Sequence, residues 1–406
     1  MVGEDNCSDN PAVLAPYSLY PLVTPEIADR PATREFFEDY AMYKRPPTEL
    51  VNLLTKTMGA FSVMPIVWVG IGSPEKIQAV ERFIWEELAG RRGLGIWIAY
   101  FHPFDQCRCF LLSFYTYRFG ERQELILQDT LENITRQGNP WGQPRADRGA
   151  WLEWAGIKAY REGNDYLLYL GCLPSYDDCC REAAAATAGL LSRAGVSFGA
   201  LGGEEDCDGN EVRMLGEDGL LEHLARGNIE RFREMGVDKV ITISPHSYNA
   251  MRNEYPELGM DFEVYHYTQV LRDLVSSGRI VSSESAASAV TYHDPCFLGR
   301  YNGIYDEPRR LLTSIPGLEL KEMIRGRERS YCCGGGSGGF CADYLGGAES
   351  SPSRSRLREA RDTGAGILAV ACPACLTMME DALAAEGLEE EMAIEDASEL
   401  LAGAVT

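Results

Sequence analysis

The sequence predicts an α/β protein in which two tandem repeats, each with a parallel sheet, follow a mostly helical N-terminal region. Segments with helical patterning that end near glycine alternate with short apolar strands from about residue 163 onward, a pattern typical of parallel sheets covered by helices. Residues 228–247 and 356–375 also follow one plan, in which a helix leads to an apolar strand and then to a proline-containing turn that opens another helix. Such internal similarity indicates a duplicated unit.

The duplication divides the chain into three parts. We expect an N-terminal region over residues 1–162, a first Rossmann-like repeat over 163–285 and a second over 286–406, with the Ser-rich stretch 281–288 as the join. Helical patterning in the N-terminal region covers residues 35–43, 48–57, 75–88 and 122–136.

Composition excludes several classes of function. The 406 residues carry a formal net charge of −23, whereas nucleic-acid binding needs clustered Lys and Arg. No apolar stretch approaches the roughly 20 residues that span a bilayer. Thirteen cysteines would suit a secreted disulfide scaffold, but residues 1–21 lack a basic start followed by an apolar run. We therefore expect a cytoplasmic protein without a membrane span or a nucleic-acid partner.

Five cysteines in the second repeat carry the chemistry. They lie in His-Asp-Pro-Cys at 293–296, Cys-Cys-Gly-Gly-Gly at 332–336 and Cys-Pro-Ala-Cys at 372–375. Adjacent Cα atoms are about 3.8 Å apart, closer than the usual disulfide range, so the neighbouring pair is a poor disulfide. Iron–sulfur clusters are the commonest centre held by so many sulfurs. The predicted ligands are Cys296, Cys332, Cys333, Cys372 and Cys375.

The predicted topology brings these peptides together. The apolar strands 289–292 and 366–371 both run directly into cysteine peptides. Because ligands gather at the carboxyl ends of strands in open α/β sheets, the cysteines should converge on one edge. Pro373 is placed to begin a helix, and thiolates at a helix start feel its positive end, which lowers their pKa.

The three peptides resemble the cysteine-rich domains of the heterodisulfide reductase type of iron–sulfur protein. The family pattern is a Cys, then Cys-Cys-Gly, then Cys-Pro-x-Cys, usually present twice, and the resemblance covers roughly residues 125–400. It implies that the second repeat holds one [4Fe–4S] cluster, of the noncubane type where relatives are characterised. In relatives such a cluster cleaves a disulfide or passes electrons.

The first repeat departs from this pattern. Cys172 and Cys207 remain, but Asp208 replaces the second Cys of the pair, and Ser-Pro-His-Ser at 244–247 replaces Cys-Pro-x-Cys. Serine and aspartate are poorer cluster ligands than thiolate, so we expect no ordinary iron–sulfur cluster here. A zinc ion held at this vestigial site by Cys172, Cys207, Asp208 and His246 is one alternative, and a scaffold without metal is the favoured one.

The N-terminal region also departs from many relatives, which carry a ferredoxin-like segment there. Its three cysteines, Cys7, Cys107 and Cys109, cannot supply such a cluster. The resemblance therefore implies an oxidoreductase subunit that exchanges electrons with ferredoxin-type or flavin-containing subunits, at most peripheral to a membrane complex. A disulfide or thiol would be the substrate if the cluster is catalytic. The alternative is a non-catalytic structural subunit with a zinc site or no metal.

Three further features leave two interpretations open. His293 is either a proton donor to a departing thiolate or a strand-end hydrogen-bonding group. Cys341 is either a sixth thiol near the cluster or an ordinary small residue. Arg300 and Arg309 either offset the negative charge of the thiolates or form surface salt bridges.

Overall fold

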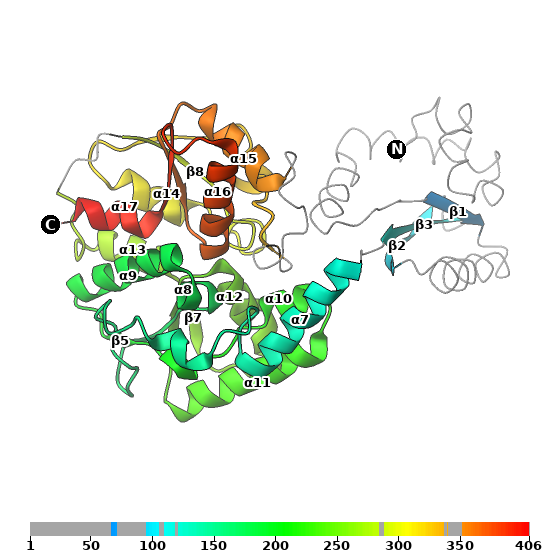
Figure 1. Cartoon of the computed structure of the whole chain (residues 1–406), viewed down its shortest axis with the longest axis horizontal. Helices are drawn as coiled ribbons and strands as arrows, with labels where there is room; N and C mark the ends of the chain where they lie inside the picture. Colours follow the sequence, from blue (N-terminus) through cyan, green and yellow to red (C-terminus); the bar gives the residue numbers. More distant parts are fainter. Residues whose placement is uncertain are drawn as a thin grey trace. The chain divides into compact units, whose positions relative to one another are not determined.

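The computed structural model describes residues 121–283, 288–336, 339 and 351–405, and the strands formed by 66–70, 95–104 and 109–117. The chain divides into two compact units, Met1–Glu124 and Leu125–Thr406. Figure 1 traces both from the N-terminus to the C-terminus.

The first unit contains a three-stranded antiparallel sheet in the order β1-β3-β2. Its strands are rich in the aromatic and branched residues that favour strands, but the sequence patterning did not predict them. The expected helices at 35–43, 48–57 and 75–88 lie outside the described residues, and the one at 122–136 is present as α7. The bounds are β1 (Ile66–Gly70), β2 (Gly95–Phe104), β3 (Cys109–Tyr117) and α7 (Glu121–Gln137).

The first repeat has a parallel four-stranded sheet in the order β5-β4-β6-β7. Helices connect the strands, as the alternating pattern predicts. The strands are β4 (Tyr166–Tyr169), β5 (Phe198–Gly199), β6 (Lys239–Thr242) and β7 (Glu263–His266). The α-helices are α8 (Cys172–Tyr176), α9 (Asp178–Arg193), α10 (Asn210–Met214), α11 (Asp218–Glu234), α12 (Pro245–Asn249) and α13 (Tyr267–Ser276). Short 3-10 or π turns cover Arg145–Gly149, Gly202–Glu204, Ala250–Glu254 and Tyr255–Leu258.

The second repeat has the same topology, with its parallel strands in the order β11-β10-β8-β9. In both sheets the second, first, third and fourth strands of the repeat lie side by side, so the predicted duplication and the α/β fold class are confirmed. The strands are β8 (Ala289–Tyr292), β9 (Glu319–Lys321), β10 (Ile367–Val370) and β11 (Ala393–Asp396). The helices are α14 (Asp306–Thr313), α15 (Pro352–Arg361), α16 (Pro373–Glu386) and α17 (Ala397–Ala404), with a 3-10 turn at Arg327–Arg329.

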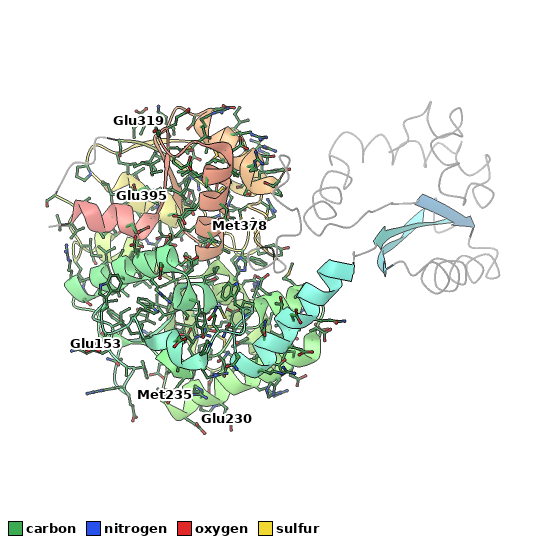
Figure 2. The ribbon with its side chains drawn as sticks, in the orientation of Figure 1. Glu153, Glu230, Met235, Glu319, Met378 and Glu395 are labelled. Carbon is green, nitrogen blue, oxygen red and sulfur yellow. The ribbon has the colours of Figure 1, made fainter. Side chains whose placement is uncertain are left out.

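Burial explains why these segments form strands. The two inner strands of each sheet, β4 and β6 or β8 and β10, bury every residue after the first, as expected of parallel strands covered on both faces. The side chains that fill the second unit are drawn in Figure 2, where exposed Glu153, Glu230 and Glu319 lie at its rim. Within the ranges described, no helix is both long enough and apolar enough to cross a membrane.

The two repeats share one hydrophobic core and lie side by side in Figure 1, the first in green and the second in yellow to red. A buried hydrogen bond joins them, because the Tyr267 hydroxyl at the start of α13 donates to Asp396 Oδ1 at 2.7 Å. Helices α9 and α17 are joined where the Ser398 hydroxyl donates to the Ala183 carbonyl at 3.1 Å. The carboxyl edges of both sheets are thereby held in one body.

Removal of the Tyr267 hydroxyl should weaken this junction. In Tyr267→Phe the buried Asp396 carboxyl group loses a donor, so we expect the free energy of unfolding to fall by about 1–3 kcal/mol, measured by urea denaturation. Tyr265→Phe is the control, since its hydroxyl donates to Glu263 at the surface, and it should change stability by less than about 0.5 kcal/mol. Equal effects of the two substitutions would contradict the role of the bond in joining the repeats.

Candidate metal centre

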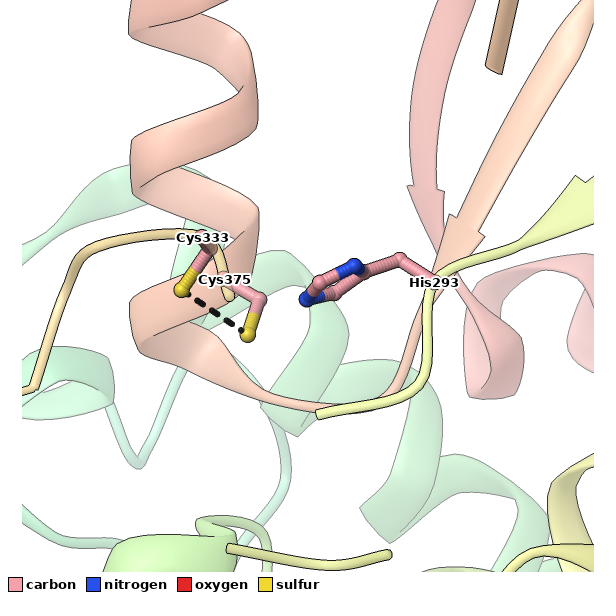
Figure 3. A group of neighbouring side chains, drawn as sticks. All are labelled: His293, Cys333 and Cys375. Carbon is pink, nitrogen blue, oxygen red and sulfur yellow. Dashed lines mark hydrogen bonds between the residues drawn. The ribbon is translucent and has the colours of Figure 1, made fainter. Parts of the chain in front are cut away.

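The second repeat places its cysteines where strands end. Cys296 follows β8, and Cys372 is the residue that caps α16 directly after β10. Helix α16 begins at Pro373 and carries Cys375 in its first turn, as the Cys-Pro-x-Cys spacing predicts. The peptide with Cys333 approaches from another segment, and Figure 3 shows this thiol beside that of Cys375.

The five thiols form one continuous group. The sulfurs of Cys333 and Cys375 are 3.3 Å apart. Cys332 interacts with the thiols of both Cys296 and Cys333, and Cys375 interacts with that of Cys372. All five are free thiols, and Cys333, Cys372 and Cys375 are buried. The structure therefore brings the predicted ligand set together, while the role of these residues as ligands stays a prediction.

The thiols differ in acidity because they share protons. Hydrogen bonds from Cys296 and then Cys333 hold the pKa of Cys332 well below its usual value. Burial opposes ionisation of Cys372, but hydrogen bonds with Cys375 and His246 lower its pKa to about 5. The partner thiol Cys375 has a raised pKa, because it shares its hydrogens with Cys333 and Cys372 and is buried. Such a group is ready to exchange its remaining protons for metal ions.

Glycine allows the backbone to face the sulfurs. The N–H of Gly334 lies 3.3 Å from Cys332 Sγ, and the N–H of Gly335 lies 3.4 Å from Cys333 Sγ. Gly334 has a φ of 86°, in the left-handed region that favours glycine. The Cys-Cys-Gly motif thus supplies two sulfurs together with the N–H donors that stabilise negative charge on them.

His293 completes the second-repeat site. It is fully buried, and its ring lies within 4.8 Å of the sulfurs of Cys333 and Cys375. Burial lowers its pKa to about 3, assisted by the nearby charge of Arg356. Within the part of the chain that the structure describes, its Nε2 has no hydrogen-bond partner. A buried polar nitrogen beside five thiols fits a metal–sulfur group held by these residues.

The two arginines considered from the sequence hold loops. Arg309 makes a two-pronged ion pair with buried Asp294, at 2.6 and 2.9 Å, and a second pair with Glu322. Arg300 donates to the carbonyl of Ser330. The Arg309 pair is buried rather than a surface salt bridge, and it fixes the peptide that carries His293.

In the first repeat a hydrogen bond replaces a thiol pair. Asp208 and Ser247 stand in the places of Cys333 and Cys375, and the Ser247 hydroxyl donates to Asp208 Oδ2 at 2.7 Å. The local backbone is unchanged, because Gly209 has a φ of 81° and its N–H lies 3.4 Å from Cys207 Sγ. This repeat therefore has the turn of the motif, with Asp208 and Ser247 in place of two of its thiols.

The vestigial cysteines have a buried cation beside them. Arg148 Nη2 lies 3.7 Å from Cys172 Sγ and 3.0 Å from Glu205 Oε1. A hydrogen bond with Cys207 lowers the pKa of Cys172, burial opposes this, and the Arg148 charge assists it. Cys172 and Cys207 line a cavity of about 40 Å³ with His246 and Ala374. Arg148 was not predicted from the sequence, because it precedes the repeat and lies in no motif.

His246 links the two repeats chemically. Its Nδ1 lies 2.5 Å from Glu211 Oε1, and its ring centroid is 4.6 Å from that of Phe297 in the second repeat. Burial opposes its protonation, but Glu211 and a hydrogen bond to Cys372 raise its pKa well above the usual value. The residue considered as a zinc ligand thus contacts the second-repeat thiols. In the sequence, this contact with the second repeat is indicated only by the position of His246 between Pro245 and Ser247.

Other predicted features fall elsewhere. Among the residues that the structure describes, the side chains close enough to share an ion as a group of three are His293, Cys333 and Cys375. The residues considered as an alternative zinc site, Cys172, Cys207, Asp208 and His246, do not form such a group. Cys7, Cys107 and Cys341 lie outside the described residues.

A comparison with known protein families agrees with the division into two repeats. A family model described as "Cysteine-rich domain" matches residues 166–252 and 290–380, which cover the first three strands of each structural repeat.

Three relatives show the same likeness. The chain is 39% identical over 287 residues to the "Probable iron-sulfur-binding oxidoreductase FadF" of Bacillus subtilis and 38% identical over 286 residues to the "EtfAB:quinone oxidoreductase" of Syntrophomonas wolfei. Each alignment covers 68% of this chain and 40% of the relative, so the chain spans well under half the length of these two proteins. It is also 35% identical over 281 residues to one of the subunits of the dihydromethanophenazine:CoB–CoM heterodisulfide reductase of Methanosarcina mazei, covering 67% of this chain and 66% of the relative.

Restoration of the missing thiols tests the equivalence of the two repeats. The variant Asp208→Cys, Ser244→Cys, Ser247→Cys returns five cysteines to a backbone whose glycine turn is intact. We expect it to bind more iron than the parent protein, up to about twice as much, in anaerobic iron and sulfide analysis. Asp208→Cys alone is the control and should gain none. An unchanged iron content in the triple variant, with the fold retained, would contradict the equivalence.

Proposed function

The chain belongs to the cysteine-rich-domain family of iron–sulfur proteins, and on that premise we propose that it is the iron–sulfur subunit of a multi-subunit oxidoreductase. It would hold one [4Fe–4S] cluster, of the noncubane type. The ligands would be Cys296, Cys332, Cys333, Cys372 and Cys375.

The observation that carries this proposal is the continuous group of five thiols. The Cys333–Cys375 separation of 3.3 Å leaves these sulfurs no room for separate functions. Tetrahedral zinc needs four ligands, so a fifth thiol favours a polynuclear centre. When bound, such a cluster supplies one-electron chemistry to a disulfide, a thiol or a redox partner.

The protein's own side chains would control the surroundings of that centre. The N–H groups of Gly334 and Gly335 face two of the sulfurs. His246, held by Glu211, faces Cys372 from the other repeat. The cavity lined by Cys172, Cys207 and Ala374 borders the helix start that carries Cys375, so a disulfide or thiol substrate would approach from there.

The net charge of the chain and the names of its relatives support a role in a complex with partner subunits. We propose that ferredoxin-type or flavin-containing subunits exchange electrons with this chain, in a cytoplasmic location peripheral to a membrane complex. The net charge of −23 suits docking against basic partner surfaces. The competing function is a structural subunit that holds zinc or no metal.

Metal analysis of cysteine variants tests the proposal. Anaerobically purified protein should contain about four irons and four sulfides per chain, and Cys333→Ser or Cys375→Ser should lose most of both. Cys179→Ser is the matched control because Cys179 is an exposed thiol outside the group, and its iron content should equal that of the parent. Zinc in place of iron, or iron retained in both site variants, would overturn the assignment.

A second measurement separates catalysis from relay. Disulfide chemistry at the site predicts that a thiol substrate changes the electron paramagnetic resonance spectrum of the oxidised protein. If the cluster only relays electrons, the spectrum should change with the applied reduction potential and should not change when the thiol is added.

A further inference from the structure

His293 and Arg356 form a buried pair that determines which ring nitrogen carries a proton. Arg356 lies in α15 and His293 directly follows β8, and both side chains are fully buried. The Arg356 Nε atom lies 3.1 Å from His293 Nδ1. A guanidinium group has donors and no acceptor, so the arginine must donate and Nδ1 must accept.

Three acceptors hold Arg356 in this orientation. Its Nη1 donates to the carbonyl of Arg325 at 2.7 Å and to Glu359 Oε2 at 3.0 Å. Its Nη2 lies 3.4 Å from the Ser330 hydroxyl. Because the guanidinium is anchored at its far side, Nε keeps facing the imidazole.

The neutral ring must then carry its hydrogen on Nε2. Among the described residues, this atom has no hydrogen-bond partner. Figure 3 shows the His293 ring directed toward Cys333 and Cys375, and one ring nitrogen lies within 4.8 Å of both sulfurs. A buried N–H that faces these sulfurs is satisfied when they carry negative charge.

We infer that His293 is an Nε2–H hydrogen-bond donor to the sulfurs at this site, rather than a metal ligand. A ligating imidazole needs a lone pair on the nitrogen that faces the metal, and its other nitrogen normally donates to a carboxylate or carbonyl. Here the other nitrogen faces a guanidinium, which imposes the opposite tautomer. Arg356 is therefore a positioning residue that acts through His293.

The effect that this N–H donor should have on the reduction potential rests on the proposed function, because it requires a bound cluster. Hydrogen bonds to cluster sulfurs favour the reduced state, because that state holds more negative charge, and so they raise the reduction potential. Loss of the donor should lower the potential, while a side chain that keeps an N–H in the same place should preserve it.

Redox titration of His293 variants tests this consequence. In anaerobic protein, His293→Leu should shift the ratio of oxidised to reduced cluster about tenfold toward oxidation, a change of about 59 mV in the negative direction for one electron. His293→Gln, which can place an amide N–H near Nε2, should stay close to the parent. His266→Leu is the control, since His266 is equally buried but bonds to Thr268 and Ile243 in the first repeat. An unshifted potential in His293→Leu with iron retained would overturn the inference.

Spectroscopy of the ring tests the tautomer independently of the cluster. In protein labelled with ¹⁵N-histidine and freed of metal, NMR should show hydrogen on Nε2 and none on Nδ1 of His293, and Arg356→Met should change that assignment. In the iron-loaded protein, pulsed paramagnetic resonance should show weak coupling to this ring. A hydrogen on Nδ1, or the strong coupling of a direct ligand, would overturn the inference. A protein that binds no iron would overturn the proposed function, while the NMR result still decides the tautomer.

Discussion

The crowding of five thiols at one buried edge is the constraint on which the rest of the site depends. Thiols at this density cannot all ionise, and the structure shows them sharing hydrogens, with lowered pKa values at Cys332 and Cys372 and raised ones at their partners. Several described groups that face these sulfurs are donors or positive ends: two glycine N–H groups, an imidazole from each repeat and the start of a helix. The surroundings are arranged for negative charge.

Comparison of the two repeats shows which features of the motif remain where its thiols are replaced. Both repeats keep the strand order and a left-handed glycine in the Cys-Cys-Gly turn or its counterpart. Where thiols are lost, the Ser247–Asp208 hydrogen bond occupies the space of the Cys375–Cys333 contact. The altered repeat is also joined to the intact one, since His246 reaches Cys372 and Tyr267 bonds to Asp396. The first repeat thus borders the thiols of the second repeat through His246.

The fold of the repeats was predictable because its signals are local. Alternating helices and apolar strands, and a proline directly after Cys372, act within a few residues of the chain. The antiparallel sheet of β1, β2 and β3 was not predicted, because its apolar segments lack the strict alternation that marks a strand. The convergence of the five cysteines followed from topology, but their function as ligands and the domain boundaries remain predictions. The partners Arg356 and Arg148 were missed because contacts such as Arg356–His293 span 63 residues without a motif.

Native mass spectrometry of the intact chain under anaerobic conditions tests the central claim most directly. The account predicts a single main species heavier than the 406-residue polypeptide by four irons and four sulfides. A species that carries one zinc ion, or the bare polypeptide alone after anaerobic purification, would contradict it.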